Sequence, residues 1–149
     1  MSALIWLHED ALRADHPLFA AACENGETAF IWPACFIWDD AYMADMGYGL
    51  KRRVFIYETL AEMNVEIYAG PLVTTLKDLA ARHKATHILT GKTPNPLLKS
   101  TMADLRETIK LSAIADEAFV QMDTIPELKR FFKYWNKAKK KAFLFDGRA

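Results

Sequence analysis

The sequence contains few of the residues on which several common kinds of site depend. Six glycines in 149 residues leave little material for a phosphate-cradling loop, and neither G-x-x-x-x-G-K-[ST] nor G-x-G-x-x-G occurs. The G-x-S-x-G and H-E-x-x-H patterns are also missing. Cys23 and Cys35 are not spaced as a metal or redox pair, and the histidines show no ligand spacing. We therefore expect no standard catalytic residue and no metal site.

Long apolar runs are missing as well. No stretch reaches the roughly 20 apolar residues that a membrane-spanning helix needs. The N-terminus lacks the basic and then apolar order of a secretory signal. We expect a cytoplasmic location and no membrane partner.

The chain has no net charge, because 19 basic residues balance 19 acidic ones. The balance is uneven along the sequence, since residues 127–149 hold eight basic side chains against only Glu127 and Asp146. A basic segment of this kind suits nucleic acid or an acidic partner. A nucleic-acid-binding domain is usually basic throughout, so this chain gives nucleic acid only weak support.

Short apolar runs alternate with longer amphipathic segments. The runs predict strands at Ala3–Leu7, Thr28–Trp32, Val65–Ala69, Thr86–Thr90 and Glu117–Gln121. The segments between them predict helices that begin at Pro17 or cover Leu50–Met63, Leu72–His83 and Met102–Leu111. This order is typical of an α/β domain, a Rossmann-like three-layer sandwich in which helices cover both faces of a five-stranded, mainly parallel sheet. We expect residues 1–149 to form a single domain of this type.

The first strand shows no alternation, which places it at the centre of the sheet, and ligands of such sheets bind beyond the carboxyl ends of the strands. The segments that follow the first, second and fourth strands are therefore the expected binding site. Trp32, Trp38, Tyr42 and Tyr48 provide rings that suit a flat heterocycle. The expected ligand-binding residues are His8, Asp10, Arg13, Trp32, Trp38, Thr90, Gly91 and Lys92.

The stretch from Trp6 to Pro17 resembles the W-F-R-R-D-L-R-x-x-D-N-P opening of the DNA photolyase/cryptochrome family. Trp6, Asp10, Asp15 and Pro17 match in place. Further along, Lys51–Leu60 resembles the R-x-x-F-L-x-E-S-L helix of that family, and Phe131–Trp135 is similar to its F-x-x-F-x-x-W segment. The resemblance implies the N-terminal α/β domain of the family, which often carries an antenna chromophore (a deazaflavin, a flavin mononucleotide or a folate).

Departures from the family pattern limit what the resemblance implies. His8 and Glu9 replace the paired arginines, and Arg13 stands one place late. Family members continue into a helical domain that holds FAD, whereas this sequence ends at Ala149. We therefore expect no bound FAD and no light-driven DNA repair by this polypeptide.

The C-terminal segment predicts a basic helix at 126–143. Its stripe of Leu128, Phe131, Phe132 and Trp135 carries too much aromatic surface to stay in water. We expect it to be buried in a homodimer, against a separate partner protein, or as a lid on the domain itself.

Three functions remain open from the sequence. The leading interpretation is a non-catalytic module that binds a flavin-like, folate-like or nucleotide-like ligand or serves as a subunit of a larger assembly. The first alternative is a small enzyme on a nucleotide-like substrate, with Asp10, His8 or Asp39 as acid or base. The second is a structural or interaction protein with a vestigial site.

Overall fold

The structure is a computed structural model. It describes residues 3–24 and 29–117, together with residues 131, 135, 136, 138 and 139; for 23, 24 and 29–33 it describes the backbone alone. The chain divides into two units, residues 1–116 and residues 117–149. The elements with defined bounds lie in the first unit.

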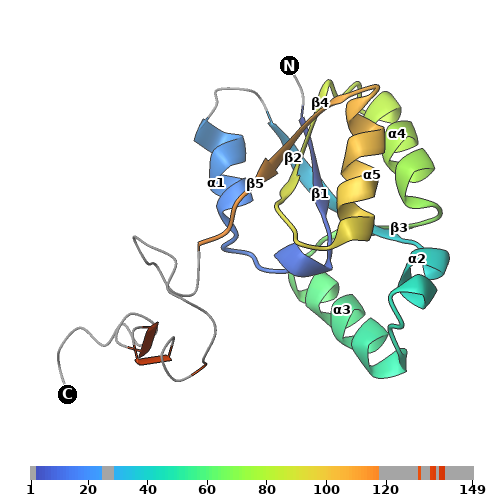
Figure 1. Ribbon diagram of the computed structural model, residues 1–149. Coiled ribbons are helices and arrows are strands. Elements are labelled where there is room, and N and C mark those ends of the chain that lie inside the picture. The colour runs from blue at the N-terminus through green and yellow to red at the C-terminus, as the bar shows by residue number, and fades with distance from the viewer. Residues whose placement is uncertain (1–2, 25–28, 118–130, 132–134, 137, 140–149) are drawn as a thin grey trace. The chain divides into compact units, whose positions relative to one another are not determined.

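In the described residues, five parallel strands form one sheet in the order β3-β2-β1-β4-β5 (Figure 1). The strands are β1 (Ala3–Leu7), β2 (Ala29–Trp38), β3 (Glu66–Ala69), β4 (His87–Gly91) and β5 (Lys110–Ile114). The helices are α1 (Pro17–Glu24), α2 (Asp40–Asp45), α3 (Leu50–Glu62), α4 (Leu72–Arg82) and α5 (Pro96–Arg106), and a 3-10 turn, η1 (Glu9–Ala11), follows β1. The predicted α/β class and parallel sheet are confirmed.

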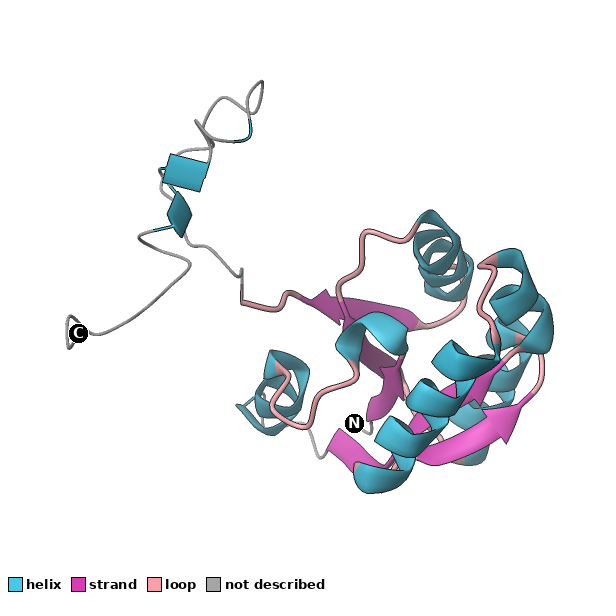
Figure 2. Ribbon diagram, turned by 90° about the horizontal axis from the view of Figure 1, so that it is seen from below, coloured by secondary structure: helices cyan, strands magenta, loops and turns pink. Residues whose placement is uncertain are grey.

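Helices cover both faces of the sheet, as the view from below shows (Figure 2). Leu4 and Trp6 of β1 pack with the apolar residues of α4 and α5. Ala3, Ile5 and Leu7 point to the other face and pack with Leu18 and Ala22 of α1. Because successive side chains of a strand alternate between faces, an all-apolar β1 buries both of them.

The second strand differs from its prediction. It does not stop before Pro33 but continues to Trp38. Its pairing with β1 shifts between Leu4, which lies opposite Phe30, and Trp6, which lies opposite Cys35. Pro33 falls inside this irregular stretch, where a residue without an N–H removes no ladder hydrogen bond. Trp32 therefore lies inside the strand, and the carboxyl end of the strand is Trp38.

The last helix and strand of the unit also differ from the sequence prediction. Helix α5 begins at Pro96, with Asn95 as its N-cap and the proline in the first turn, a start signal that the prediction missed. The residues predicted as the end of this helix belong to β5, a strand that the sequence did not predict. Of the strand expected at Glu117–Gln121, only Glu117 is described, in no helix or strand, and the rest lies outside the described residues. The segment Ile109-Lys-Leu-Ser-Ala-Ile alternates between apolar and polar residues as a half-buried strand does, and only Leu111 of β5 is fully buried.

The C-terminal unit is described in a few residues only. Residues 131, 135, 136, 138 and 139 are helical, and the Phe131 and Trp135 rings stack with their centroids 6.2 Å apart. The rest of the helix predicted at 126–143 lies outside the described residues, as do the stripe residues Leu128 and Phe132. The homodimer and lid predictions for this segment stay predictions.

Candidate functional site

The sheet order creates one place where neighbouring loops diverge. From β1 the chain moves outward through β2 to β3, then crosses back to β4 on the other side of β1 and continues to β5. The connections after β1 and β4 therefore leave the sheet in different directions, which is the arrangement that opens a ligand crevice in parallel α/β sheets. Residues 8–16, 92–95 and the segment after Trp38 form this edge.

His8 joins the ends of β1 and β4. Its side chain is only 1% exposed. The Nδ1 atom accepts a hydrogen bond from the Asp10 backbone N–H at 3.2 Å, so the proton is on Nε2, which donates to the Gly91 carbonyl oxygen at 2.6 Å. Both ring nitrogens are used within the protein. The contacts explain why a histidine at this position stabilises the strand ends, and a ligand contact by His8 stays a prediction.

At Gly91 the end of β4 lies close against the connection that follows β1. A Cβ atom at this position would lie 2.7 Å from the Ala11 Cβ and 3.3 Å from the His16 Nε2. Because Cβ atoms essentially never approach to 2.7 Å, any larger residue would push η1 away from β4. The glycine predicted as a binding residue thus packs β4 against the first connection.

A hydrogen-bond network connects the segments after β1, β2 and β4. The Glu9 carboxylate accepts from the Tyr42 hydroxyl, and its Oε1 also accepts from the Tyr48 hydroxyl at 2.9 Å. The Asn95 Nδ2 donates to the Tyr42 hydroxyl oxygen at 2.8 Å. We call Glu9, Asp10, Tyr42, Tyr48, Thr93 and Asn95 the edge network.

Asp10 and Thr93 extend the edge network toward β4. The Thr93 hydroxyl donates to Asp10 Oδ2, and the Thr93 Oγ1 accepts from the Asn95 backbone N–H at 3.0 Å. Asn95 in turn caps α5, because its side-chain oxygen accepts from the Leu97 N–H at 3.0 Å. A change at any of these three side chains would therefore reach the start of α5.

The two tyrosines of the edge network are held in their neutral form. Burial, followed by the hydrogen bond to Glu9 and the negative charge of that carboxylate, raises the pKa of Tyr48 to about 12. The same causes, in the same order, raise the pKa of Tyr42 well above its usual value. Each tyrosine keeps its hydroxyl proton to donate to Glu9, so the phenols act as donors at neutral pH.

Asp39 has a structural role at the end of β2. One of its oxygens accepts from the Tyr42 N–H and the other from the Leu72 N–H, each at 3.0 Å. The carboxylate thus caps α2 and also contacts the first turn of α4. Next to it, Asp40 accepts from the Trp38 indole Nε1 at 3.2 Å. The half-buried Trp38 is fixed beside α2 by this bond.

A cavity of about 620 Å³ lies beyond the edge network. Its lining residues come from the first connection, from the segment after α2, from α3 and from the start of α5: Asp10, Met46, Tyr48, Arg52, Pro94, Asn95, Pro96 and Leu97. The Arg52 Cζ lies 4.3 Å from the centre of the Tyr48 ring. A mainly apolar wall with one carboxylate, one guanidinium and one amide is a typical lining for an organic ligand of moderate size.

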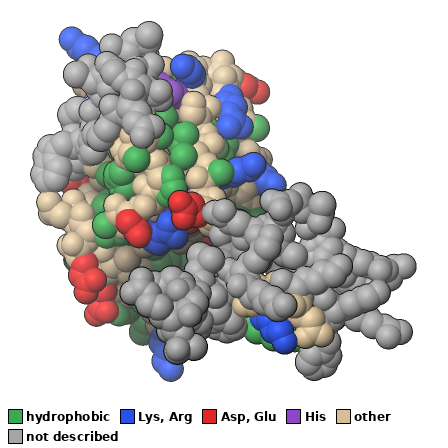
Figure 3. Space-filling model, turned by 90° about the vertical axis from the view of Figure 1, so that its left-hand side faces the viewer, with side chains coloured by type: hydrophobic (Ala, Val, Ile, Leu, Met, Phe, Trp, Pro, Cys, Tyr) green, Lys and Arg blue, Asp and Glu red, His purple; other side chains and the backbone are tan. Residues whose placement is uncertain are grey.

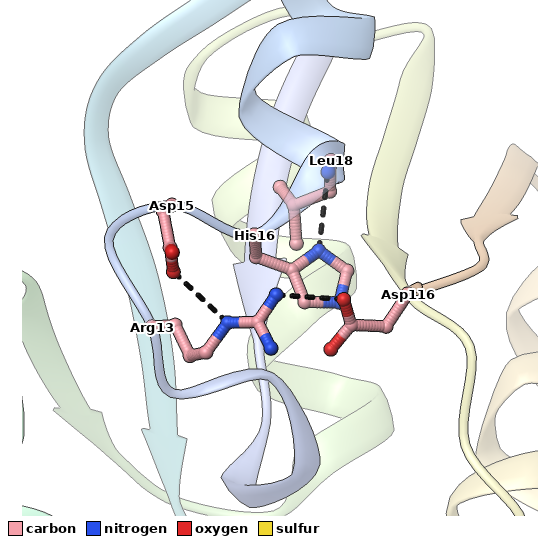
Figure 4. A network of polar contacts seen from close by, with 5 residues as sticks. All are labelled: Arg13, Asp15, His16, Leu18 and Asp116. Atoms are coloured by element: carbon pink, nitrogen blue, oxygen red, sulfur yellow. Dashed lines mark hydrogen bonds and ion pairs between the residues drawn. The ribbon is translucent and has the colours of Figure 1, made fainter. Parts of the chain in front are cut away.

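Residues 12–16, the second half of the connection after β1, do not line this cavity. The Arg13 guanidinium lies between two carboxylates, 2.9 Å from Asp15 and 2.6 Å from Asp116 (Figure 4). The buried His16 ring accepts from the Leu18 N–H at 3.1 Å and so caps α1. Burial is the main cause that lowers the pKa of His16, and its Nε2 is one of two buried polar side-chain atoms in the described residues without a hydrogen-bond partner.

Of the residues expected to bind a ligand, only some lie at the cavity. Asp10 lines the cavity, whereas Arg13 forms the ion pairs described above. Thr90 is buried inside β4, and its hydroxyl is the second unpartnered atom. Lys92 is exposed and lines a different hollow with Lys99 and Asp116. The side chain of Trp32 lies outside the described ones.

Sequence reasoning missed several residues of the cavity. Met46 and Leu97 carried no motif, because their positions depend on α2, which was not predicted, and on the early start of α5. Arg52 lies on the predicted helix α3 but was not named as a binding residue. Tyr48 was expected only as a ring for stacking, and its bond to Glu9 was not foreseen. The basic residues at the start of α3 were one signal, since they oppose the helix dipole and so suggest another role.

The described part of the chain holds neither a cluster of metal ligands nor a membrane-spanning helix. No group of three or more histidine, cysteine, aspartate or glutamate side chains is placed there to hold a metal ion. No helix in the same residues is long and apolar enough to cross a membrane. On the face of the molecule drawn in Figure 3, acidic and basic side chains both appear beside hydrophobic ones.

The comparisons with known proteins assign no family. No protein-family model matches the chain, and no curated protein matches it. Solved structures do match, among them the crystal structure of a hypothetical protein, PH0823, which is 10% identical with a TM-score of 0.45 over 78% of this chain and 97% of that chain. A likeness this distant carries no functional argument. Residues 1–116 form a five-stranded parallel α/β unit with a Rossmann-like fold.

Proposed function

We propose that this chain is a binding module for a flat heterocyclic or nucleotide-like ligand, held in the cavity beyond the edge network. The observation that carries the proposal is the cavity itself. It lies where the connections after β1 and β4 diverge, and its volume of about 620 Å³ suits a ligand of drug or cofactor size.

The lining supports a ligand with an anionic group and a ring. Arg52 is the basic residue of the lining, and a guanidinium binds phosphate or carboxylate through two parallel hydrogen bonds. Its planar group also stacks on aromatic rings, as it does on Tyr48 here. Asp10 on the opposite connection accepts hydrogen bonds from ring N–H or ribose hydroxyl groups.

The resemblance to the photolyase antenna domain narrows the ligand within this class. Flavin mononucleotide, a deazaflavin and a folate each combine a flat ring system with phosphate or carboxylate groups. We propose an antenna-type chromophore of this chemistry as the ligand, held without a reaction. The acid/base alternative has less support, because His8 and Asp39 are both engaged in hydrogen bonds that hold the fold.

The experiment begins with the absorption spectrum of freshly purified protein and mass spectrometry of what it releases on denaturation. The protein is then titrated with flavin mononucleotide, a deazaflavin, a reduced folate and AMP. We expect a bound or binding ligand from this panel. Leu97→Trp, which places a large side chain in the cavity from an exposed position, should abolish binding without unfolding the chain.

A matched pair of variants tests the role of charge. Arg52→Gln should weaken binding of an anionic ligand by about tenfold or more, since a charged hydrogen bond is lost. Lys51→Gln removes the same charge from the neighbouring residue, which does not line the cavity, and should leave the affinity unchanged. Equal losses in the two variants, or no binding by any member of the panel, would contradict the proposal.

A further inference from the structure

The outer face of α3 carries an apolar stripe that the fold does not use. Ile56 and Leu60 point inward and are buried in the core. Leu50, Val54 and Tyr57 point outward and are 78%, 44% and 57% exposed. Together with the exposed Ala61 they are spaced by four, three and four residues, which is one face of a helix. We call these four residues the α3 stripe.

An exposed stripe at this spacing is the usual surface for a second helix. Figure 1 shows α3 at the margin of the α/β unit, with its outer side turned away from the sheet. Ile56 and Leu60 of the inner face already anchor α3 in the core, whereas Leu50, Val54 and Tyr57 keep 78%, 44% and 57% of their surface exposed. Its retention on the surface is unfavourable unless something covers it.

The α3 stripe is complementary to itself when two copies run antiparallel. In one register, Leu50 lies opposite Ala61 of the second copy and Val54 lies opposite Tyr57 of the second copy. Each layer pairs a larger side chain with a smaller one. A twofold axis between the helices repeats both layers, which is the property that an isologous dimer requires.

The charges beside the stripe fit the same register. Lys51 and Glu58 lie along one flank of the stripe, seven residues apart. In the described residues neither has an ion-pair partner. An antiparallel pair brings Lys51 beside Glu58 of the second copy, twice by symmetry. It also brings the basic first turn of each α3 next to the carboxyl end of the other helix, where positive charge is favourable.

We propose that a second copy of this chain docks on the α3 stripe, in an antiparallel helix pair with Lys51–Glu58 ion pairs at both ends. This interface is distinct from the aromatic stripe of residues 128–135 and does not depend on the proposed ligand. The helix has 13 residues and is therefore only about 20 Å long. An interface of this size makes a reversible dimer, so the mass should depend on concentration.

The test is sedimentation velocity of the full chain from low-micromolar to near-millimolar concentration. We expect a monomer–dimer equilibrium in the parent. Tyr57→Asp should weaken it by more than about tenfold, because a charge would be buried at the twofold axis. Phe55→Asp is the matched control, since Phe55 is an exposed aromatic residue of the same helix, 66% exposed, outside the stripe. It should leave the equilibrium unchanged.

A charge exchange tests the register. K51E and E58K should each weaken the dimer through like-charge contacts, and the double variant K51E/E58K should restore it toward the parent level. None of these exposed substitutions should change the thermal unfolding of the monomer. A parent chain that is monomeric throughout, or dimers that resist Tyr57→Asp, would overturn the proposal. Dimers that dissociate only in F131A/W135A would place the interface in the C-terminal unit instead.

Discussion

The two halves of the connection after β1 are held by different chemistry. The first half, Glu9 and Asp10, is fixed by three hydroxyl donors from the segments after β2 and β4, in a partly buried network. The second half is fixed at Arg13 by ion pairs with exposed carboxylates. A buried hydroxyl that donates to a carboxylate recovers most of the free energy that it loses on leaving water. In an exposed ion pair, water weakens the attraction between the two charges. The first half should therefore be the rigid one, and it is the half that borders the cavity.

Gly91→Ala should have the largest effect, because Gly91 touches both halves. The new methyl would lie 2.7 Å from the Ala11 Cβ, so η1 or β4 must move. We expect a loss of about 3 kcal/mol in the free energy of unfolding, measured by urea denaturation. Ala11→Gly in the same chain should recover part of it, because it removes the opposing atom. An unchanged midpoint in Gly91→Ala would show that the two connections are not packed as described.

Tyr42→Phe should come next. It removes a hydroxyl that donates to Glu9 and accepts from Asn95, and so leaves two polar groups of the edge network without this partner. A loss of about 2 kcal/mol is expected from the same measurement. Tyr57→Phe, which removes an exposed hydroxyl, is the control and should be neutral.

Of the two halves, alkaline pH should act on the first; outside both, the pKa values of Tyr68 and Cys35 are also raised to about 12. The pKa of Tyr48 is raised from 10.0 to about 12, so the folded chain keeps a proton that the unfolded chain releases. The stabilisation is fully present below pH 10 and is lost as the pH rises from about 10 to 12. Unfolding curves across this range should show the loss of stability. The tyrosinate absorbance of the folded chain should rise at a higher pH than that of the unfolded chain. In the Tyr42→Phe/Tyr48→Phe variant, stability should fall less steeply over this pH range. If it falls as steeply as in the parent, the loss of stability comes from other titrating groups.

Arg13→Gln should have the smallest effect, since it removes only the exposed ion pairs of the second half. We expect a melting temperature close to that of the parent and no change in ligand affinity. A clear loss of stability would show that the ion pairs of the second half contribute more than the comparison between the two halves assigns to them.

The sequence was sufficient for the features that depend on local pattern. The unbroken apolar run of β1 predicted a central strand, and the 3.6-residue period predicted α3 and α4 nearly to their ends. The sequence was insufficient where a local signal for the end of a strand conflicted with the pairing of that strand in the sheet. Pro33 normally ends a strand, yet the register shift against β1 lets β2 pass it.

The candidate site was predictable only as a location. The carboxyl edge followed from the order of strands, and Asp10 and Tyr48 were named from it. The contacts between segments were not predictable, because the edge-network bonds that connect them join residues that are distant in sequence. Asn95 reaches Tyr42 across 53 positions and Thr93 reaches Asp10 across 83. No pattern within one segment records such a pairing.

The central position of β1 also determines when the protein can fold. β1 is synthesised before the other strands of the sheet, yet one of its two neighbours is β4, and the bond that ties their ends joins residues 83 positions apart. A ribosome must therefore release most of the α/β unit before β1 is covered on both edges. Until then an apolar strand with an open edge is available to other chains, and closing so long a loop slows the folding step. A strand that is buried along its whole length in the native protein is thus the one exposed longest during synthesis of the unit.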